Sequence, residues 1–158
     1  MKRVDRREAF GILASGLMTV ASACGGRGTT VIQTPEGPVL QLERDDFLVL
    51  VSDFQDSYHP GERVAVKVIL NNQSARFASA RVRMRLLGRG QQAVAEADVA
   101  SVNVKPDEAA MLERSLVVPQ DLQPGEYTLS VELPPWSFEG RQTGGGALTT
   151  SIQVHPHP

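Results

Sequence analysis

The sequence of 158 residues predicts an all-β protein, a single antiparallel β-sandwich of seven or eight strands that follows an N-terminal leader and a linker. Apolar residues recur at every second position in several separate windows, as in strands with one buried face. Turn-forming residues separate these windows at intervals of about 8 to 12 residues, which is typical of sandwiches. After residue 45 no window has a 3.6-residue apolar period of helical length.

The first 23 residues have the features of a bacterial export signal. The chain begins with the basic side chains of Lys2, Arg3, Arg6 and Arg7. An apolar segment of 11 residues follows at 10–20. Signal peptides have apolar segments of about 7 to 15 residues, whereas a membrane-spanning helix needs about 20. We therefore expect residues 1–23 to be a cleaved signal peptide.

Small residues at Ala21, Ser22 and Ala23 precede Cys24 and resemble a bacterial lipobox. The resemblance implies that the thiolate of Cys24 accepts a diacylglycerol and that this residue begins the mature protein. Cys24 is the only cysteine, so we expect the fold to hold without disulfides. The alternative is an ordinary secretory signal that leaves a free thiol.

The pair Arg6 and Arg7, followed by Ala9 and Phe10, resembles a twin-arginine signal. Asp5 stands where that motif usually has Ser or Thr, and two arginines also occur by chance in basic leaders, so the general secretory route stays open. Either route predicts a lipid-anchored protein of the cell membrane or envelope that faces the periplasm or the exterior.

Removal of residues 1–23 leaves 12 basic and 16 acidic side chains, a net charge of −4. This balance argues against a nucleic-acid partner.

Residues 24–44 are rich in Gly and Pro, and we expect a flexible tether with a span of about 25 Å. In the alternative, Val39–Leu42 forms an edge strand. Residues 45–158 are long enough for one core and are assigned to the sandwich.

The first expected strand, Phe47–Val51, is apolar on both faces. Pro60-Gly61 is a turn pair, and Val64–Leu70 then has apolar residues at every second position. Asn71-Asn72-Gln73-Ser74 ends this strand.

In the next strand Val82, Met84 and Leu86 alternate with arginines, which predicts one buried and one exposed face. The segment 107–116 tolerates a helix, but its flanking prolines and β-branched residues favour a strand. The remaining expected strands are 92–97, 99–104, 111–118, 128–133 and 148–154.

Leu122, Pro124 and Tyr127 resemble the tyrosine corner of immunoglobulin-like and fibronectin-type sandwiches. The resemblance implies that residues 81–86, 128–133 and 148–154 are strands C, F and G. It also implies that loops 71–79 and 134–147 share the tethered, membrane-facing pole. The opposite pole is expected to carry the three histidines, His59, His155 and His157.

The candidate partner-binding residues lie at the tethered pole, in loops 71–79 and 134–147, and on strand C. Loop 134–147 carries Trp136, Phe138 and Arg141, which suit a binding anchor, although Trp136 also suits a cap on the core. Phe77 lies in loop 71–79. A basic stripe of Arg81, Arg83 and Arg85 suits acidic lipid heads or an acidic partner; alternatively it is a solvated face paired with Glu96 and Asp98.

The sequence contains no motif for a catalytic residue set, and Gly144-Gly145-Gly146 lacks the Lys-Ser or Lys-Thr of a phosphate loop. We expect no enzyme activity, cofactor or metal. The sequence therefore predicts a lipid-anchored accessory or interaction module that binds an envelope protein. One alternative is a metal-binding protein that uses the three histidines. Another is a chagasin-like protease inhibitor, which Pro135-Trp136 resembles in part.

Overall fold

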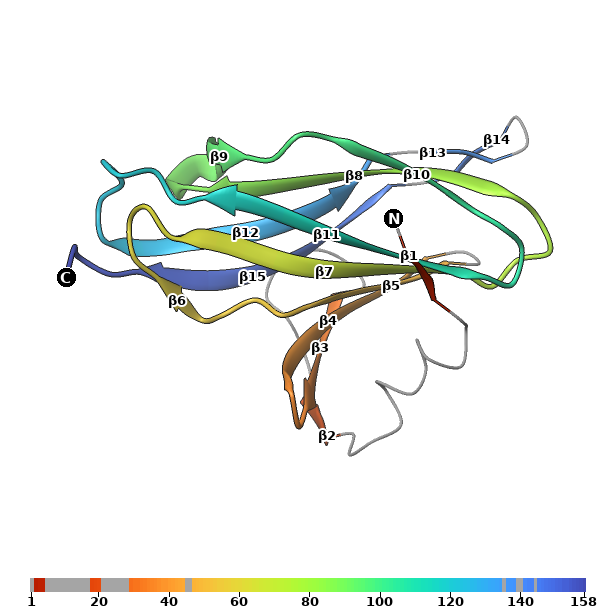
Figure 1. Ribbon diagram of the computed structural model, residues 1–158, viewed down its shortest axis with the longest axis horizontal. Helices are drawn as coiled ribbons and strands as arrows, with labels where there is room; N and C mark the ends of the chain where they lie inside the picture. Colours follow the sequence, from red (N-terminus) through yellow and green to blue (C-terminus); the bar gives the residue numbers. More distant parts are fainter. Residues whose placement is uncertain are drawn as a thin grey trace.

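The computed structural model describes residues 2–4, 18–20, 29–44, 47–134, 136–138, 141–143 and 145–158. These residues form a sandwich of two β-sheets (Figure 1). The helical structure among them is a single 3-10 turn, Arg89–Gln91. None of the described helical structure has the length and apolar character needed to cross a membrane.

The first sheet has seven strands, and every neighbouring pair in it is antiparallel. In spatial order they are β1 (Lys2–Val4), β11 (Ala109–Val117), β7 (Arg63–Asn72), β5 (Phe47–Ser52), β4 (Gly37–Arg44), β3 (Thr29–Thr34) and β2 (Met18–Val20). The two strands from the predicted leader, β1 and β2, therefore lie at opposite edges of this sheet.

The second sheet contains the expected strands C, F and G as direct neighbours. Its order is β10 (Ala100–Val104), β8 (Ala78–Leu87), β12 (Gly125–Leu133), β15 (Gly146–Val154) and β6 (Ser57–Tyr58), with β9 (Ala93–Glu96) also paired to β8. The short strand β6 runs parallel to β15 and was not expected. A separate hairpin is formed by β13 (Trp136–Phe138) and β14 (Arg141–Thr143).

The all-β, immunoglobulin-like sandwich predicted from the sequence is confirmed. Strands C, F and G correspond to β8, β12 and β15, and the segment at 107–116 is mostly strand β11. The tyrosine corner is also present, because the hydroxyl of Tyr127 donates a hydrogen bond to the carbonyl of Gln123 at 2.7 Å. This contact fixes the turn that leads into strand β12.

The expected flexible tether at 24–44 is wrong for residues 29–44, which form the hairpin β3–β4. The alternative strand at Val39–Leu42 lies within β4, although β3 covers its outer edge. Thr34 and Gly37 close its turn, where the Thr34 hydroxyl donates to the Gly37 carbonyl at 2.7 Å and Gly37 has a φ of 124°. Leu40 and Leu42 are buried in the sandwich core. Pro35 and Gly37 therefore mark a hairpin turn rather than a mobile linker.

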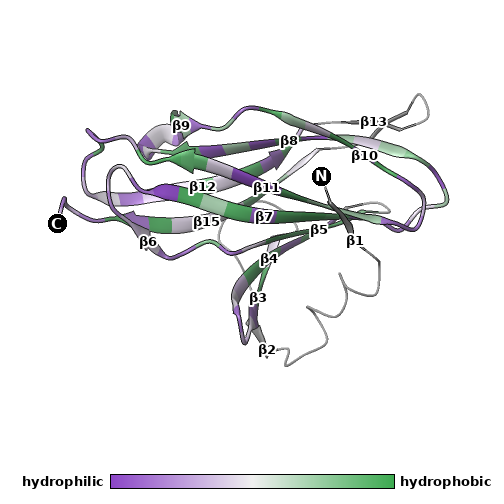
Figure 2. Ribbon diagram, viewed as in Figure 1, coloured by the Kyte–Doolittle hydropathy of each residue, from purple (hydrophilic) through white to green (hydrophobic). Residues whose placement is uncertain are grey.

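The core lies between the inner faces of the two sheets and contains mainly aliphatic side chains. On β8, Val82, Met84 and Leu86 are each 0% exposed, as their alternation with arginines predicted. Figure 2 shows the corresponding change between hydrophobic and hydrophilic colours along this strand. Aliphatic burial therefore accounts for the contact between the sheets.

A second group of buried side chains lies on the opposite, outer face of the first sheet. The alternation of side chains along β5 explains it, because Val49 and Val51 belong to the core while Leu48 and Leu50 point the other way. We call this group the outer apolar cluster. Its members are Val39, Leu48, Leu50, Ile69 and Ala109, with the partly buried Met111 packed against them.

The side chain of Asn72 connects three segments at one pole of the sandwich. Its Nδ2 donates to the carbonyl oxygens of Arg76 at 2.7 Å, Val104 at 3.2 Å and Lys105 at 3.3 Å. Its Oδ1 accepts from the Ser74 amide at 3.1 Å and the Ser74 hydroxyl at 2.7 Å. The amide therefore holds the loop between β7 and β8 against the turn between β10 and β11.

The phenol of Tyr58 is buried in the core beside a short loop. Its hydroxyl accepts a hydrogen bond from the amide of Gln55 at 2.7 Å, and the residue is 3% exposed. Burial raises the pKa of Tyr58 above 10.0, and the nearby carboxylates of Glu62 and Asp56 raise it further, whereas the Gln55 amide opposes the shift.

Neighbouring asparagines give a matched test of buried hydrogen bonding. Replacing Asn72 by Ala should lower the free energy of unfolding by about 2 to 4 kcal/mol, since several buried groups lose their partner. Replacing Asn71 by Ala should change it by less than about 1 kcal/mol, because the Asn71 side-chain amide is buried with no hydrogen-bond partner among the described residues. Urea unfolding of both variants measures the difference. Equal losses would contradict the role given to Asn72.

Tyr58 should make the protein sensitive to alkali. Because its pKa is higher in the folded state than in the unfolded state, deprotonation favours unfolding, and stability is lost as the pH rises above about 10. The contribution to the slope is at most about 1.4 kcal/mol per pH unit. Urea unfolding between pH 8 and pH 11 should show a shallower decline for Tyr58→Phe than for the parent. Parallel curves would contradict the assignment.

Candidate partner-binding surface

The aromatic arm predicted to bind a partner is a short hairpin beside strand β8. Trp136 pairs with Thr143 across β13 and β14, and Phe138 pairs with Arg141. Strand β13 lies against β8, and the hairpin occupies the end of the sandwich opposite the C-terminus (Figure 1). The side chains of this hairpin lie outside the described residues. Whether Trp136 caps the core or anchors a partner therefore stays a prediction.

The predicted basic residues occupy the outer face of β8, next to this hairpin. We call Arg81, Arg83 and Arg85 the arginine stripe. Arg81 is exposed, whereas the side chains of Arg83 and Arg85 are 41% and 25% exposed. Phe77, which directly precedes β8, is 49% exposed. The fold therefore places Phe77, the stripe and the backbone of the hairpin on or beside strand β8, although the hairpin is a separate two-stranded sheet.

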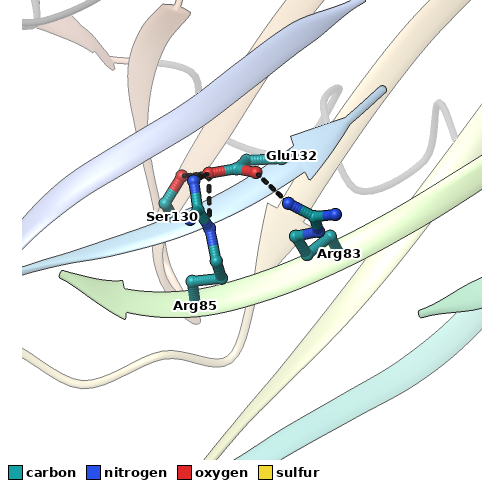
Figure 3. Close-up of polar contacts among 4 residues, drawn as sticks. All are labelled: Arg83, Arg85, Ser130 and Glu132. Carbon is teal, nitrogen blue, oxygen red and sulfur yellow. Dashed lines mark hydrogen bonds and ion pairs between the residues drawn. The ribbon is translucent and has the colours of Figure 1, made fainter. Parts of the chain in front are cut away.

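A single carboxylate from the neighbouring strand β12 binds two members of the stripe (Figure 3). Glu132 Oε1 accepts from Arg85 Nε at 2.9 Å and also from Arg85 Nη2. Glu132 Oε2 lies 3.9 Å from Arg83 Nη1. This partner was not predicted; the sequence had suggested Glu96 and Asp98. Glu132 neutralises one of three positive charges, so the stripe keeps a local excess of positive charge.

The stripe borders a shallow concave surface at the junction of β12 and β15. It has a volume of about 520 Å³, and its lining combines the charged pair with apolar and glycine positions. The lining residues are Arg83, Glu132, Leu133, Pro134, Gly145, Gly146 and Ala147. The lining therefore offers both charged and apolar contacts.

The three histidines gather at the opposite pole, as predicted. The rings of His59 and His155 are 5.7 Å apart between centroids. Backbone carbonyls engage two of the rings, since His59 Nδ1 lies 2.9 Å from the Pro156 oxygen and His157 Nε2 lies 3.0 Å from the Gln120 oxygen. In the described part of the chain, no three potential ligands are grouped in a way that would hold a metal ion.

Several predicted residues cannot be placed. Cys24, Arg6 and Arg7 lie outside the described residues, so lipidation and the twin-arginine signal stay predictions. Pro135, which carries part of the resemblance to chagasin-type inhibitors, also lies outside them.

No protein family model and no curated protein matches the sequence. Among solved structures, the β-glucosidase from Listeria innocua in complex with isofagomine has a TM-score of 0.53 at 13% identity, covering 70% of this chain and 16% of that chain. The CARDB domain of the PF1109 protein from Pyrococcus furiosus, in complex with di-metal ions, has a TM-score of 0.51 at 17% identity, covering 72% and 90%.

These similarities show the fold. At such low identity they support an immunoglobulin-like sandwich and carry no site residue across. This chain spans only 16% of the glucosidase's length, so the likeness concerns one part of that enzyme. The CARDB domain matches over most of its own length.

Removing the carboxylate of Glu132 should destabilise the fold. Glu132→Gln leaves the partly buried Arg85 without its counter-charge, and we expect a loss of about 1 to 2 kcal/mol in the free energy of unfolding. Arg81→Gln is the matched control, because no ion pair joins this exposed side chain to a described residue; a change within about 0.5 kcal/mol is expected. Urea unfolding measures both. A Glu132→Gln variant as stable as the parent would contradict the assignment.

Proposed function

We propose that this chain is a lipid-anchored protein of the bacterial cell envelope whose sandwich is a non-enzymatic interaction module. The lipid is attached at Cys24, and the partner is another envelope protein that contacts the loop pole and strand β8. The lipobox-like sequence before Cys24 supports the anchor, and the positions of the predicted binding residues support the interaction module.

The short distance between Cys24 and the folded domain is the observation that carries the proposal. Strand β3 begins at Thr29 rather than beyond residue 44. Five residue steps separate Cys24 from Thr29, and an extended chain covers at most about 18 Å in five steps. A lipid on Cys24 would therefore hold the sandwich directly at the bilayer surface.

The contacts of Thr29 support one orientation of the proposed anchored domain. Its hydroxyl donates to the carbonyl of Ala147 at 3.0 Å, next to the start of β15. A Cβ added at Gly146 would lie 2.6 Å from Leu42 Cδ2, so the end of the β3–β4 hairpin packs closely on this region. An anchor at Cys24 would therefore place the end that carries the β13–β14 hairpin nearest the bilayer.

This orientation suggests the chemistry of the partner. Trp136, Phe138 and Phe77 would supply apolar anchors, while Arg141 and the arginine stripe would supply positive charge. A partner surface with acidic residues around an apolar contact would complement them. Because the candidate residues would lie near the bilayer, the partner would be an envelope protein held at the same membrane. The net charge of −4 after leader removal argues against nucleic acid.

Replacement of the proposed lipid acceptor tests the anchor. In the native host, the parent protein should incorporate radioactive palmitate and remain in the membrane fraction after a high-salt wash. Cys24→Ser should lose the label and move to the soluble fraction, since the thiolate nucleophile is absent.

A displaced thiol provides the control. The double variant Cys24→Ser with Ser101→Cys restores one cysteine at an exposed position on β10, and it should stay unlabelled and soluble. Labelling of Cys24→Ser, or a parent protein that salt alone releases, would refute the lipid anchor.

A further inference from the structure

A pocket lies on the outer face of the first sheet, where β7 and β11 run side by side. We call it the β7–β11 pocket. Its volume is about 440 Å³, within the range of about 300 to 1,000 Å³ that small-molecule sites occupy. Strand β7 begins and β11 ends toward the pole that carries the C-terminus (Figure 1). The lining includes Asp53, Arg63, Ala65, Lys67, Glu113 and Ser115.

Two small side chains form the floor of this pocket. Ala65 on β7 and Ser115 on β11 lie opposite each other in register. The neighbouring Val64, Val66 and Leu116 are core residues, so the alternation of side chains directs Ala65 and Ser115 to the outer face. Longer charged side chains at the flanking positions surround the floor. The pocket therefore arises from a small pair set among large side chains.

The charged side chains of the pocket do not all neutralise one another. Lys67 lies opposite Glu113 in register, but its Nζ forms an ion pair with Asp53 Oδ2 at 3.3 Å. The Glu113 carboxylate is left with no ion pair or hydrogen bond in the described part of the chain. The guanidinium of Arg63 has a single long hydrogen bond there, from Nη1 to the Ser115 hydroxyl at 3.4 Å. One positive and one negative group thus line the same pocket, and neither has an oppositely charged partner among the described residues.

Arg114 also lines the pocket, but its side chain does not add a charge to it. Leu112 and Leu116 pack on the core side of β11, and Arg114 lies between them with the same alternation. Its guanidinium donates to the Asp98 carbonyl. The groups available to a ligand are therefore the guanidinium of Arg63, the carboxylate of Glu113 and the hydroxyl of Ser115.

These groups determine the chemistry of a suitable ligand. A guanidinium beside a hydroxyl can donate hydrogen bonds to a carboxylate, and a carboxylate can accept them from an ammonium group. Ser115, which Arg63 contacts, lies two positions from Glu113, a separation of about 7 Å along the strand. A molecule with a carboxylate at one end and an ammonium group at the other can bridge this separation.

We propose that the β7–β11 pocket binds a small zwitterion with one carboxylate and one ammonium group, the chemistry shared by free amino acids and short peptides. Arg63 and Ser115 bind the carboxylate, and Glu113 binds the ammonium group. Binding in this pocket depends on neither the lipid at Cys24 nor the protein partner.

Titration of the full chain, labelled with nitrogen-15, with glycine, diglycine and triglycine tests the proposal. The three probes carry the same two charges at increasing separation. At least one should shift the amide resonances of residues 63–67 and 113–115 to saturation. Arg63→Gln and Glu113→Gln should each weaken binding about tenfold, because each removes one charged hydrogen-bonding group. Glu126→Gln is the matched control, exposed on β12 in the second sheet, and should leave binding unchanged.

Capped probes distinguish a zwitterion site from a site for a single ion. The probe that binds most tightly is tested again in its N-acetylated form and in its C-amidated form, and each should bind about tenfold more weakly. Tightest binding of glycine would assign the pocket to a free amino acid, and tightest binding of diglycine or triglycine to a short peptide.

Three results would overturn the proposal. They are no binding of any zwitterion, a capped probe that binds as tightly as its parent compound, and shifts that lie outside the pocket. Because Arg63 and Glu113 are exposed, their Gln variants should fold, and folded variants that bind like the parent protein would also overturn it. The capped probes need only the parent protein, so they decide the question even if a variant does not fold.

Discussion

The buried amide of Asn72 is the contact on which the arrangement of the loop pole depends. Aliphatic packing holds the two sheets together, but it is non-directional. It therefore does not determine the conformation of the connecting loops or the residue at which the next strand begins. Hydrogen bonds are directional, and Asn72 binds carbonyl groups from the loop before β8 and from the turn after β10. It therefore sets the start of β8, the strand that carries the arginine stripe.

Most strands could be predicted because period-two burial is a local property of the sequence. The alternation along β8 gave both its position and its faces, whereas the apolar run along β5 gave only its position. For the β3–β4 hairpin the sequence offered both a linker and a strand at Val39–Leu42 and could not decide between them, because a turn and a linker both contain Gly and Pro. What separates them is the burial of Leu40 and Leu42, which depends on the neighbouring strand β5. The two-residue strand β6 is too short for any period to show.

In the candidate surface, features set by neighbouring residues could likewise be predicted, whereas contacts between distant residues could not. The alternation with core residues placed the arginine stripe on an exposed face. Its partner Glu132 lies 47 positions from Arg85, and only the pairing of β8 with β12 brings them together. The outer apolar cluster had a signal in Leu48 and Leu50, but its extent across β7 and β11 required the strand order.

One edge of the second sheet consists of two short strands, β9 and β10, instead of one long strand. Strands β9 and β10 share one side of β8, the register shifts between Leu86 and Leu87, and the guanidinium of Arg114 on β11 donates to the Asp98 carbonyl in the gap. A long edge strand with unpaired backbone N–H and C=O groups can pair with the edge strand of another molecule and so start aggregation. Two short strands in place of one long strand therefore make this side of the sheet a poorer template for pairing with another molecule.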